Sequence, residues 1–599
     1  MVNIKINGNI VSVPEGSTIL EAAEVAKIHI PHLCYLKDIN EIGACRLCCV
    51  EVEGEDKLIP ACDSEVREGM VIVTNSPRVK NATRVNLELI MSQHDGQCTS
   101  CVRGGNCQLQ KLANDYNLIS NSYKKSYPSE AQRRWTTTFP IIRDAEKCIK
   151  CMRCIQVCDK IQDLHVWDLV GTGSRTRVDV GEGKVIKESD CAQCGQCITH
   201  CPVGALRERD DTEKVMYALE NPDIITVVQI APAVRSAYAE ELGLSSDVAT
   251  VNRLAGALKT IGFDYVFDTS FTADLTIMEE GMELIRRLKA GDLEKYPMFT
   301  SCCPGWVRFI NSQYPDMVDR LSSAKSPQQM FGAVIKNYYA TKLGVSPDKI
   351  CCVSIMPCTA KKGEAEIPEM QNKDGIRDVD IVLTTRELMR MFRAERIHLQ
   401  DAAEVPFDSI LGSYTSAGVI FGTTGGVLEA ALRSAYYFVT GELPDADAFS
   451  KIRANDLNSL GVAPSGSLSA KGKSCDNETT KPWREATYDI AGIPIRVAVT
   501  SGLGNTRKLM NAIKRGDVKY EFVEVMACPG GCAGGGGQPI HCDDIERSME
   551  RGQILRNIDF KSPARFSHEN PDVKALYEDW LGEPGSEIAE EYLHTHKHN

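Results

Sequence analysis

Two cysteine runs restrict what this chain can fold into more than any other feature of the sequence. "CIKCMRCIQVC" begins at residue 148 and "CAQCGQCITHCP" at residue 191, and both have the spacing C-x2-C-x2-C-x3-C. This spacing is typical of ferredoxins with two 4Fe-4S clusters, in which the fourth cysteine of each run binds the other cluster. We therefore predict that one cluster binds Cys148, Cys151, Cys154 and Cys201 and that its neighbour binds Cys158, Cys191, Cys194 and Cys197.

The whole chain is rich in cysteine, with 25 among 599 residues. The sequence has no apolar run of about 18 residues, as a membrane span would need, and its start lacks the basic and apolar regions of a secretory signal. We therefore expect a soluble cytoplasmic protein, in which many cysteines indicate metal or redox chemistry rather than disulfides. The formal net charge of -13 argues against nucleic acid and anionic membranes as partners.

The first residues predict a small α+β domain. Asn7-Gly8, a dipeptide favoured in tight hairpin turns, lies between alternating apolar residues, and Thr18 and Glu21 have the spacing of a helix capping box. Four cysteines follow with the spacing C-x10-C-x2-C-x13-C, namely Cys34, Cys45, Cys48 and Cys62. A tight pair between two distant ligands suits a 2Fe-2S cluster wrapped by a loop, and a zinc site is the alternative.

A further set of ligands occurs in "HDGQCTSCVRGGNC". His94, Cys98, Cys101 and Cys107 have the spacing H-x3-C-x2-C-x5-C, and the glycines of the loop allow backbone N–H groups to approach sulfur. Taken alone, this set suits zinc as well as a 4Fe-4S cluster, and the neighbouring motifs favour the cluster. The first part of the chain is thus expected to hold one 2Fe-2S and three 4Fe-4S clusters, a row suited to passing single electrons.

After residue 210 the pattern becomes that of an α/β fold. Buried-strand runs such as "IITVVQIAP", "CCVSIMPC" and "IRVAVTSG" alternate with helical segments such as "VRSAYAEELG" and "GNTRKLMNAIKRG". "GVIFGTTGGVLEAAL" and "VAVTSGLGNTRKL" are each predicted to join a strand to a helix through glycines. Neither completes a nucleotide-binding motif, but the first is a candidate for directing helix N-terminal amides at small ligands.

Four more cysteines occur in three loops of this half: Cys303 in "TSCCPGW", Cys358 in "MPCTAKKGE", and Cys528 and Cys532 in "EVMACPGGCAGGGGQP". At these loops the chain resembles the FeFe (iron-only) hydrogenases, and its N-terminal part resembles the accessory-cluster half of the larger members. The resemblance implies an H-cluster, in which a 4Fe-4S cubane is joined through one cysteine sulfur to a two-iron unit carrying CO, CN⁻ and a bridging dithiolate amine. By position these four cysteines would hold the cubane, with Cys532 as the bridge.

The expected architecture is an α/β catalytic domain, with two lobes of parallel-type sheet and flanking helices, preceded by α+β iron-sulfur domains. We place a 2Fe-2S domain like plant ferredoxin at residues 1–78, a His/Cys3 4Fe-4S domain at 79–125, a two-cluster 4Fe-4S ferredoxin domain at 126–210 and the H-cluster domain at 211–599.

Cys302 stands beside a predicted ligand but is left without an iron. Side chains of adjacent residues on an extended strand point in opposite directions, so Cys302 and Cys303 are not expected to reach the same iron. The resemblance implies that Cys302 instead carries protons to the two-iron unit.

A relay behind Cys302 is expected in "LTIMEEGMELIRRL". On a helix Glu280 and Glu283 share a face, and Glu283 and Arg287 have the spacing of an ion pair. A solvated charged face is the ordinary interpretation of such a helix. The resemblance instead assigns these residues, together with Ser322, to a proton path from the surface.

Further pocket residues follow from the resemblance. Lys361 would donate to a cyanide ligand, because a buried ammonium suits an anionic group. Met356 and Met526 precede cluster cysteines and would pack on the two-iron unit, although filling gaps in the core is the simpler role. Ala231, Pro232 and Gln328 match other positions of the pocket.

Three features depart from the family pattern. Gly363 stands where many members have an aromatic residue, which would loosen packing over the active site, and Ala233 stands where some have serine, which removes one hydrogen bond. Residues 455–482 are polar and predict an exposed insertion, either a docking loop or a tolerated surface loop. Five cysteines have no assigned role, of which the first three are expected to be structural: Cys49, Cys351, Cys352, Cys475 and Cys542.

The resemblance implies an enzyme that catalyses 2H⁺ + 2e⁻ ⇌ H2, with electrons relayed through the accessory clusters. Its expected partners are a ferredoxin, an NAD(P)-linked flavoprotein subunit, or both, in a hetero-oligomer or as a free-standing enzyme. Two other classes are alternatives: an electron-transfer subunit of an NADH dehydrogenase-like complex, and a non-catalytic relative that senses hydrogen or assembles iron-sulfur clusters. The sequence favours neither direction of the reaction.

Overall fold

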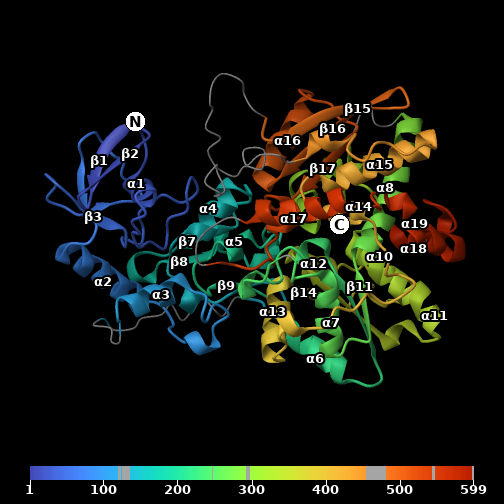
Figure 1. Cartoon of the computed structure of the whole chain (residues 1–599), viewed down its shortest axis with the longest axis horizontal. Helices are drawn as coiled ribbons and strands as arrows, with labels where there is room; N and C mark the ends of the chain where they lie inside the picture. The colour runs from blue at the N-terminus through green and yellow to red at the C-terminus, as the bar shows by residue number, and fades with distance from the viewer. Residues whose placement is uncertain are drawn as a thin grey trace.

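The computed structural model describes residues 1–118, 123, 135–245, 247–291, 297–453, 481–541 and 547–595. The N-terminal domain lies at one end of the molecule and the C-terminal half forms the larger body at the other, with the helices and strands of the cysteine runs between them (Figure 1). The predicted insertion at 455–482 falls almost entirely outside the described residues, as do Cys475 and Cys542. No helix in the described ranges is long and apolar enough to cross a membrane.

The N-terminal domain has the predicted hairpin and helix. Strands β1 (Val2–Ile6) and β2 (Asn9–Val13) pair antiparallel around a turn in which Asn7 and Gly8 have φ of 49° and 89°. The capping box at Thr18 forms and starts helix α1 (Ile19–Val25). The sheet has the order β2-β1-β5-β3-β4 and is completed by β3 (Cys49–Val52), β4 (Ile59–Pro60) and β5 (Val71–Val73).

The remaining accessory region is built from short elements. Helices α2 (Pro77–Ser92) and α3 (Gln108–Asp115) flank the His94 loop. The two cysteine runs each enter a helix, α4 (Arg153–Lys160) or α5 (Gln196–Thr199), and lie between β6 (Ile141–Arg143) and β9 (Leu206–Glu208), which pair antiparallel. The hairpin of β7 (Trp167–Val170) and β8 (Arg177–Val180) separates the runs. This is the α+β arrangement that the sequence predicts.

The C-terminal half contains two four-stranded sheets. The first is parallel, in the order β11-β10-β13-β14: β11 (Tyr265–Asp268), β10 (Ile225–Ile230), β13 (Ile350–Met356) and β14 (Ile381–Thr384). The second has the order β12-β17-β16-β15: β12 (Met298–Phe299), β17 (Phe522–Met526), β16 (Ile493–Ser501) and β15 (Arg484–Ile490). Only β15 in it is antiparallel to its neighbour. The two predicted lobes of mainly parallel sheet are thus present, and Cys352 is fully buried in β13 as expected.

Two long helices pack together in the body of this half. Helix α8 (Ser270–Ala290) contacts α15 (Gly426–Thr440), α14 (Ser416–Ile420) and α10 (Pro327–Val334). Residues of α8 and α15 share a buried apolar core with the second sheet. Helix α8 carries the predicted glutamates of the proton relay, so packing fixes them beside both sheets.

Three local predictions were wrong. "VRSAYAEELG" forms turns and a short 3-10 segment (Glu240–Leu242) instead of a regular helix. "GVIFGTTGGVLEAAL" begins with helix α14, so its glycines join two helices rather than a strand and a helix. The N-terminal amides of α15 are not available for small ligands, because Gly425 and Leu428 donate to the Glu524 carboxylate at 2.6 and 2.8 Å.

Candidate active site

Three loops at the carboxyl ends of strands converge on one buried cavity, the position where open α/β sheets bind ligands. The loops follow β12, β13 and β17. The cavity is lined by the predicted cubane ligands, the free cysteine, the lysine and the other predicted pocket residues: Cys303, Cys358, Cys528, Cys532, Cys302, Lys361, Ala231, Pro232, Gln328, Met356 and Met526. The fold therefore brings together residues that are far apart in the sequence.

The thiols of this cavity suit an iron-sulfur cluster. All four are free rather than disulfide-bonded. Burial raises the pKa of Cys358 to about 11, and Cys303 adds to the shift. Burial, followed by Cys303 and Cys358, likewise raises the pKa of Cys532. In an apolar cavity each thiolate disfavours ionisation of the next thiol, so a bound cation is needed to hold all of them as thiolates. The iron of a cluster is such a cation.

The cysteine loops also pack closely enough to close around a cluster. A Cβ at Gly535 would lie 2.1 Å from the Pro357 carbonyl oxygen, so only glycine allows these two loops to meet. Among the described residues, no three His, Cys, Asp or Glu side chains lie close enough to share a single metal ion. The ligands of a cubane need not do so, because each of them binds a different iron.

Cys302 and Cys303 have different surroundings. Strand β12 ends at Phe299, so the predicted strand alternation does not apply to them, and both line the cavity. The Ala527 backbone N–H donates to the Cys303 sulfur at 3.4 Å. Burial and then the nearby Glu280 raise the pKa of Cys302 well above its usual value. Cys303 is thus held by a backbone amide, as cluster ligands are, whereas Cys302 lies near a carboxyl group.

Lys361 is a fixed cation in the cavity wall. Its ammonium donates to the Cys302 carbonyl oxygen at 3.1 Å and to the Glu364 carboxylate at 2.9 Å. Burial opposes the charge, but Glu364 keeps the pKa of Lys361 above its usual value. Glu364 also accepts from Ser326 and Gln328, both at 3.0 Å. Sequence reasoning missed Glu364, although its position three residues after Lys361 on a helix was a signal.

The predicted relay residues lie in order along α8 and the neighbouring loop. Glu280 is fully buried, and neither of its carboxyl oxygens has a hydrogen-bond partner of good geometry among the described residues. Burial and then the charge of Glu283 raise its pKa to about 8, and Ser322 partly offsets the shift. Ser322 donates to Glu283 at 2.7 Å, and Arg287 pairs with Glu283 at 2.6 Å. This face of α8 is not merely a solvated surface.

The predicted 2Fe-2S ligands fall into two pairs. The sulfurs of Cys34 and Cys45 are 3.4 Å apart, as are those of Cys48 and Cys62. Two thiolates bound tetrahedrally to one metal, with bonds of about 2.3 Å, would be about 3.8 Å apart. Each pair is therefore spaced to bind one of two irons.

His94 is oriented for metal binding. Its Nδ1 donates to the Lys147 carbonyl oxygen at 2.8 Å, which leaves the lone pair of Nε2 available. Burial lowers the pKa of His94, so that the ring is neutral, as a metal ligand must be.

Contacts between the cysteine segments define a route from the accessory region to the cavity. Asn40 donates to the backbone of both Cys34 and Cys151, and Arg103 donates to the carbonyl oxygen of Cys201 at 3.1 Å. The Cys528 thiol lies 3.8 Å from the carbonyl oxygen of Cys194. The 2Fe-2S segment and the His94 segment thus both meet the cysteines of the first 4Fe-4S set, and the second set adjoins the cavity.

Residues 224–536 match the family model described as iron only hydrogenase large subunit, C-terminal domain. The chain belongs to the iron-only hydrogenase family. It is 44% identical to the NADP-reducing hydrogenase subunit HndD of Solidesulfovibrio fructosivorans, across 100% of this chain and 98% of that protein. It is 37% identical to iron hydrogenase 1 of Clostridium pasteurianum, across 99% of both. The solved apo [FeFe]-hydrogenase HydA1 of Chlamydomonas reinhardtii is 40% identical, with a TM-score of 0.55, over 65% of this chain and 98% of that one.

Other family models match the flanking regions of this hydrogenase. They describe a 2Fe-2S iron-sulfur cluster binding domain at residues 1–77, an NADH-ubiquinone oxidoreductase-G iron-sulfur binding region at 84–121, a 4Fe-4S dicluster domain at 147–205 and an iron hydrogenase small subunit at 545–599. The protein is therefore an oxidoreductase that interconverts protons, electrons and H2, with accessory iron-sulfur domains before its catalytic domain.

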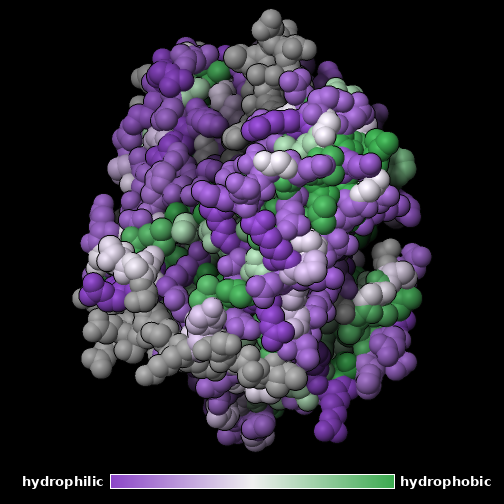
Figure 2. Space-filling view, turned by 90° about the vertical axis from the view of Figure 1, so that its left-hand side faces the viewer, coloured by the Kyte–Doolittle hydropathy of each residue, from purple (hydrophilic) through white to green (hydrophobic). Residues whose placement is uncertain are grey.

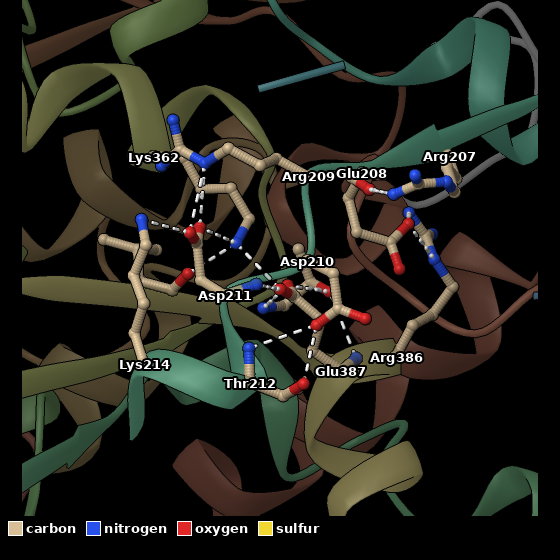
Figure 3. Close-up of polar contacts among 12 residues, drawn as sticks. Arg207, Glu208, Arg209, Asp210, Asp211, Thr212, Lys214, Lys362, Arg386 and Glu387 are labelled. Carbon is tan, nitrogen blue, oxygen red and sulfur yellow. Dashed lines mark hydrogen bonds and ion pairs between the residues drawn. The ribbon is translucent and has the colours of Figure 1, made fainter. Parts of the chain in front are cut away.

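A buried ion-pair network joins the accessory domains of the hydrogenase to its active site (Figure 3). Lys362, next to Lys361 on helix α12 (Ala360–Glu364), pairs with Asp211 at 2.8 Å and with Glu387 at 2.9 Å. Glu208, at the end of β9, pairs with Arg386 at 2.6 Å. Breaking a buried pair is costly because it leaves an uncompensated charge. The network therefore fixes α12 against the segment that leaves the ferredoxin region.

Two departures from the family pattern have simple structural outcomes. A Cβ at Gly363 would lie 2.0 Å from the side-chain oxygen of Gln193, so the expected loosening of packing is wrong. The side chain of Gln193, from the second cysteine run, occupies that space. The backbone carbonyl oxygen of Gln193 accepts a hydrogen bond from the Thr359 hydroxyl at 2.6 Å. The Ala233 carbonyl oxygen accepts from Gln538 at 2.9 Å, which ties this residue to the Cys532 loop.

Proposed function

We propose that Cys303, Cys358, Cys528 and Cys532 hold the cubane of the H-cluster, with Cys532 as the bridge to the two-iron unit. The convergence of the four thiols, Cys302 and Lys361 on one apolar cavity carries this proposal. When bound, the two-iron unit supplies the metal centre at which protons and electrons combine. The chain supplies the thiolates, the cation of Lys361 and a cavity that excludes water.

We propose that electrons travel along the row of cysteine segments. The 2Fe-2S segment and the His94 segment would be two entry points that meet at the cluster of Cys148, Cys151, Cys154 and Cys201. The cluster of Cys158, Cys191, Cys194 and Cys197 would connect it to the cubane, because Cys194 lies beside Cys528. For the domains of this row we propose the boundaries expected from the sequence, 1–78, 79–125 and 126–210, followed by the H-cluster domain at 211–599.

The cluster count can be measured as iron. One 2Fe-2S cluster, three accessory 4Fe-4S clusters and a six-iron H-cluster require about 20 irons per chain. We expect this value in protein matured under anaerobic conditions, and about 18 in protein made without the two-iron unit. A value near 14 in fully matured protein would contradict the assignment of the four cavity cysteines.

His94 offers a test of the second entry point. Replacing His94 with alanine is expected to reduce iron by up to about four atoms per chain, because one ligand of a 4Fe-4S cluster is lost. The signals of the other clusters in electron paramagnetic resonance should be unchanged. The matched control is His32→Ala, a histidine next to the 2Fe-2S segment whose Nδ1 contacts the Ile30 carbonyl oxygen at 3.1 Å. Iron loss in the control alone would contradict the assignment.

We propose that protons pass between Cys302 and the surface through Glu280, Ser322 and Glu283. The observations that support this path are the buried carboxyl group of Glu280, whose pKa is raised by burial and by Glu283 and lowered by Ser322, and the hydrogen bond from Ser322 to Glu283. Arg287 would fix the outer carboxylate.

We infer that the chain acts in the cytoplasm in a hetero-oligomer with an NAD(P)-linked flavoprotein subunit. The similarity to a subunit of an NADP-reducing hydrogenase supports this inference, and the chain lacks a nucleotide-binding motif of its own. The face at the N-terminal end is mostly hydrophilic with separate hydrophobic patches (Figure 2), and electron-transfer partners commonly dock through small interfaces. Reduction of NAD(P)⁺ by H2 should require both proteins. Reduction of ferredoxin but not NAD(P)⁺ by the mixture would contradict this partner.

A further inference from the structure

The C-terminal segment lies directly against the proposed proton path. Ala324 and His594 form an antiparallel β-bridge. The Lys325 backbone N–H donates to the Leu593 carbonyl oxygen at 2.8 Å, and the Thr595 N–H donates to the Ser323 carbonyl oxygen at 2.7 Å. The last described residues of the chain therefore pair with the segment that begins at Ser322, although they come from the part that matches the hydrogenase small subunit.

The ring of His594 connects this segment to helix α8. Its Nδ1 is 2.8 Å from the Ser323 hydroxyl, and its Nε2 is 3.0 Å from the Glu279 carboxylate. The Ser323 backbone N–H in turn donates to Glu283 at 3.0 Å. The side chain of His594 is 2% exposed, so these contacts are shielded from water. His594 is thus linked through one residue to the outer carboxylate of the path.

The charged groups around His594 are mostly carboxylates. Glu279 and Glu283 approach from α8, and Glu590 from α19 (Glu587–Leu593) lies 3.8 Å from Nδ1. The Tyr577 hydroxyl donates to Glu279. Among the described residues, the nearby arginines are already paired: Arg286 with Glu590 at 3.6 Å and Arg287 with Glu283 at 2.6 Å. Burial opposes protonation of the ring, but Glu279, Glu590 and Glu283 raise the pKa of His594 above its usual value.

We propose that His594 is a positioning residue of the proton path: through Ser323 it holds the Ser322–Ser323 segment on Glu283, and in its protonated form it adds a positive charge at the outer end of the path. This inference rests on the proton path proposed above. A protonated imidazole at the outer end of the path repels a proton held there, so that protons arriving from Glu280 are released to solvent faster. The effect should be largest for H2 oxidation, in which protons leave the enzyme.

The variant His594→Gln keeps polar contacts but removes the charge. We expect the rate of H2 oxidation at pH 6 to fall about tenfold, which corresponds to about 1.4 kcal/mol, because the positive charge at the end of the path is lost. The rate of H2 evolution should change less than about threefold. A purely structural defect would slow both directions alike, and that result would overturn the proposal.

The pH dependence gives a second readout. In the wild type, the rate of H2 oxidation should have an inflection above about pH 6.5, the ordinary imidazole value, and His594→Gln should lack it. Glu279→Gln, which removes the partner that raises the pKa of His594, should move the inflection to lower pH. An inflection that is unchanged in both variants would overturn the proposal.

Carbon-13 NMR of histidine-labelled enzyme measures the ring itself, independently of activity. The resonance that His594→Gln removes should titrate above about 6.5 in the wild type and at lower pH in Glu279→Gln. The same resonance titrating below about 6.5 in the wild type would overturn the proposal.

His568→Gln is the matched control. His568 is also a buried histidine of the C-terminal segment, but it stacks on Tyr437 at 4.0 Å and burial lowers its pKa to about 4. This variant should keep the wild-type pH profile. Glu283→Gln separates the two proposals. Full activity in this variant would contradict the proton path. If Glu283→Gln loses activity but His594→Gln behaves like the wild type, only the role of His594 is contradicted.

Discussion

Replacing Cys302 with alanine is expected to lower the rate of H2 evolution about a thousandfold or more while leaving all clusters in place. Positioned acids and bases contribute about 10² to 10⁴ to rates, and Cys302 is the inner end of the proposed proton path. The thiol lines the cavity beside Cys303, and burial followed by the charge of Glu280 raises its pKa. Alanine removes the group that holds the proton without removing a predicted iron ligand.

The measurement is H2 evolution with a chemical reductant, together with iron content. The control is Cys352→Ala, since Cys352 is also buried but lies in strand β13 and is not among the residues that line the cavity. It should keep activity within about threefold, because a thiol packed in the core acts only as a small apolar group. If Cys302→Ala kept normal turnover, protons would have to reach the active site by another way. Loss of iron in that variant would instead make Cys302 a ligand.

Glu280→Gln is expected to lower turnover by about two to three orders of magnitude, because an amide cannot relay a proton. The wild-type rate of H2 evolution should also fall above pH 8, since the pKa of Glu280 is raised to about 8 and the group loses its transferable proton there. The rates of both enzymes across pH 6 to 10 are the measurement. A wild-type profile with no change near pH 8, combined with normal activity in Glu280→Gln, would rule out this residue.

Stability gives an independent check on Glu280. Between its usual pKa of 4.5 and the raised value of about 8, the folded protein binds more protons here than the unfolded chain does. The free energy of unfolding of the wild type should therefore decrease as pH rises across this interval, and Glu280→Gln should lack that contribution.

Glu524→Gln is the control for the activity of Glu280→Gln. It also changes a buried carboxyl with a raised pKa, but Glu524 binds the N-terminus of α15 and is not on the path.

Several features of the fold and site were predictable because they depend on short-range chemistry. The hairpin at Asn7-Gly8 and the capping box at Thr18 are specified by neighbouring residues, and the structure has both. The cysteine spacings and the resemblance together indicated which residues would meet in the cavity, and the fold brings them there.

Other features depend on contacts between distant segments, which periodicity does not contain. The "VRSAYAEELG" stretch has a helical pattern, but Arg235 within it pairs with Asp268 at the end of β11, and the backbone turns instead. Gln193 fills the space at Gly363 because the ferredoxin region packs against the catalytic domain there. The contact between His594 and Ser323 joins residues 271 positions apart.

The most direct test of the central claim, that the cavity holds an H-cluster, is infrared spectroscopy of the protein matured under anaerobic conditions. We expect stretching bands of CO and CN⁻ bound to iron, and their loss in Cys358→Ala, which removes a proposed ligand of the cubane but none of the proposed accessory ligands. Matured protein with its full content of iron but without these bands would contradict the assignment of the active site.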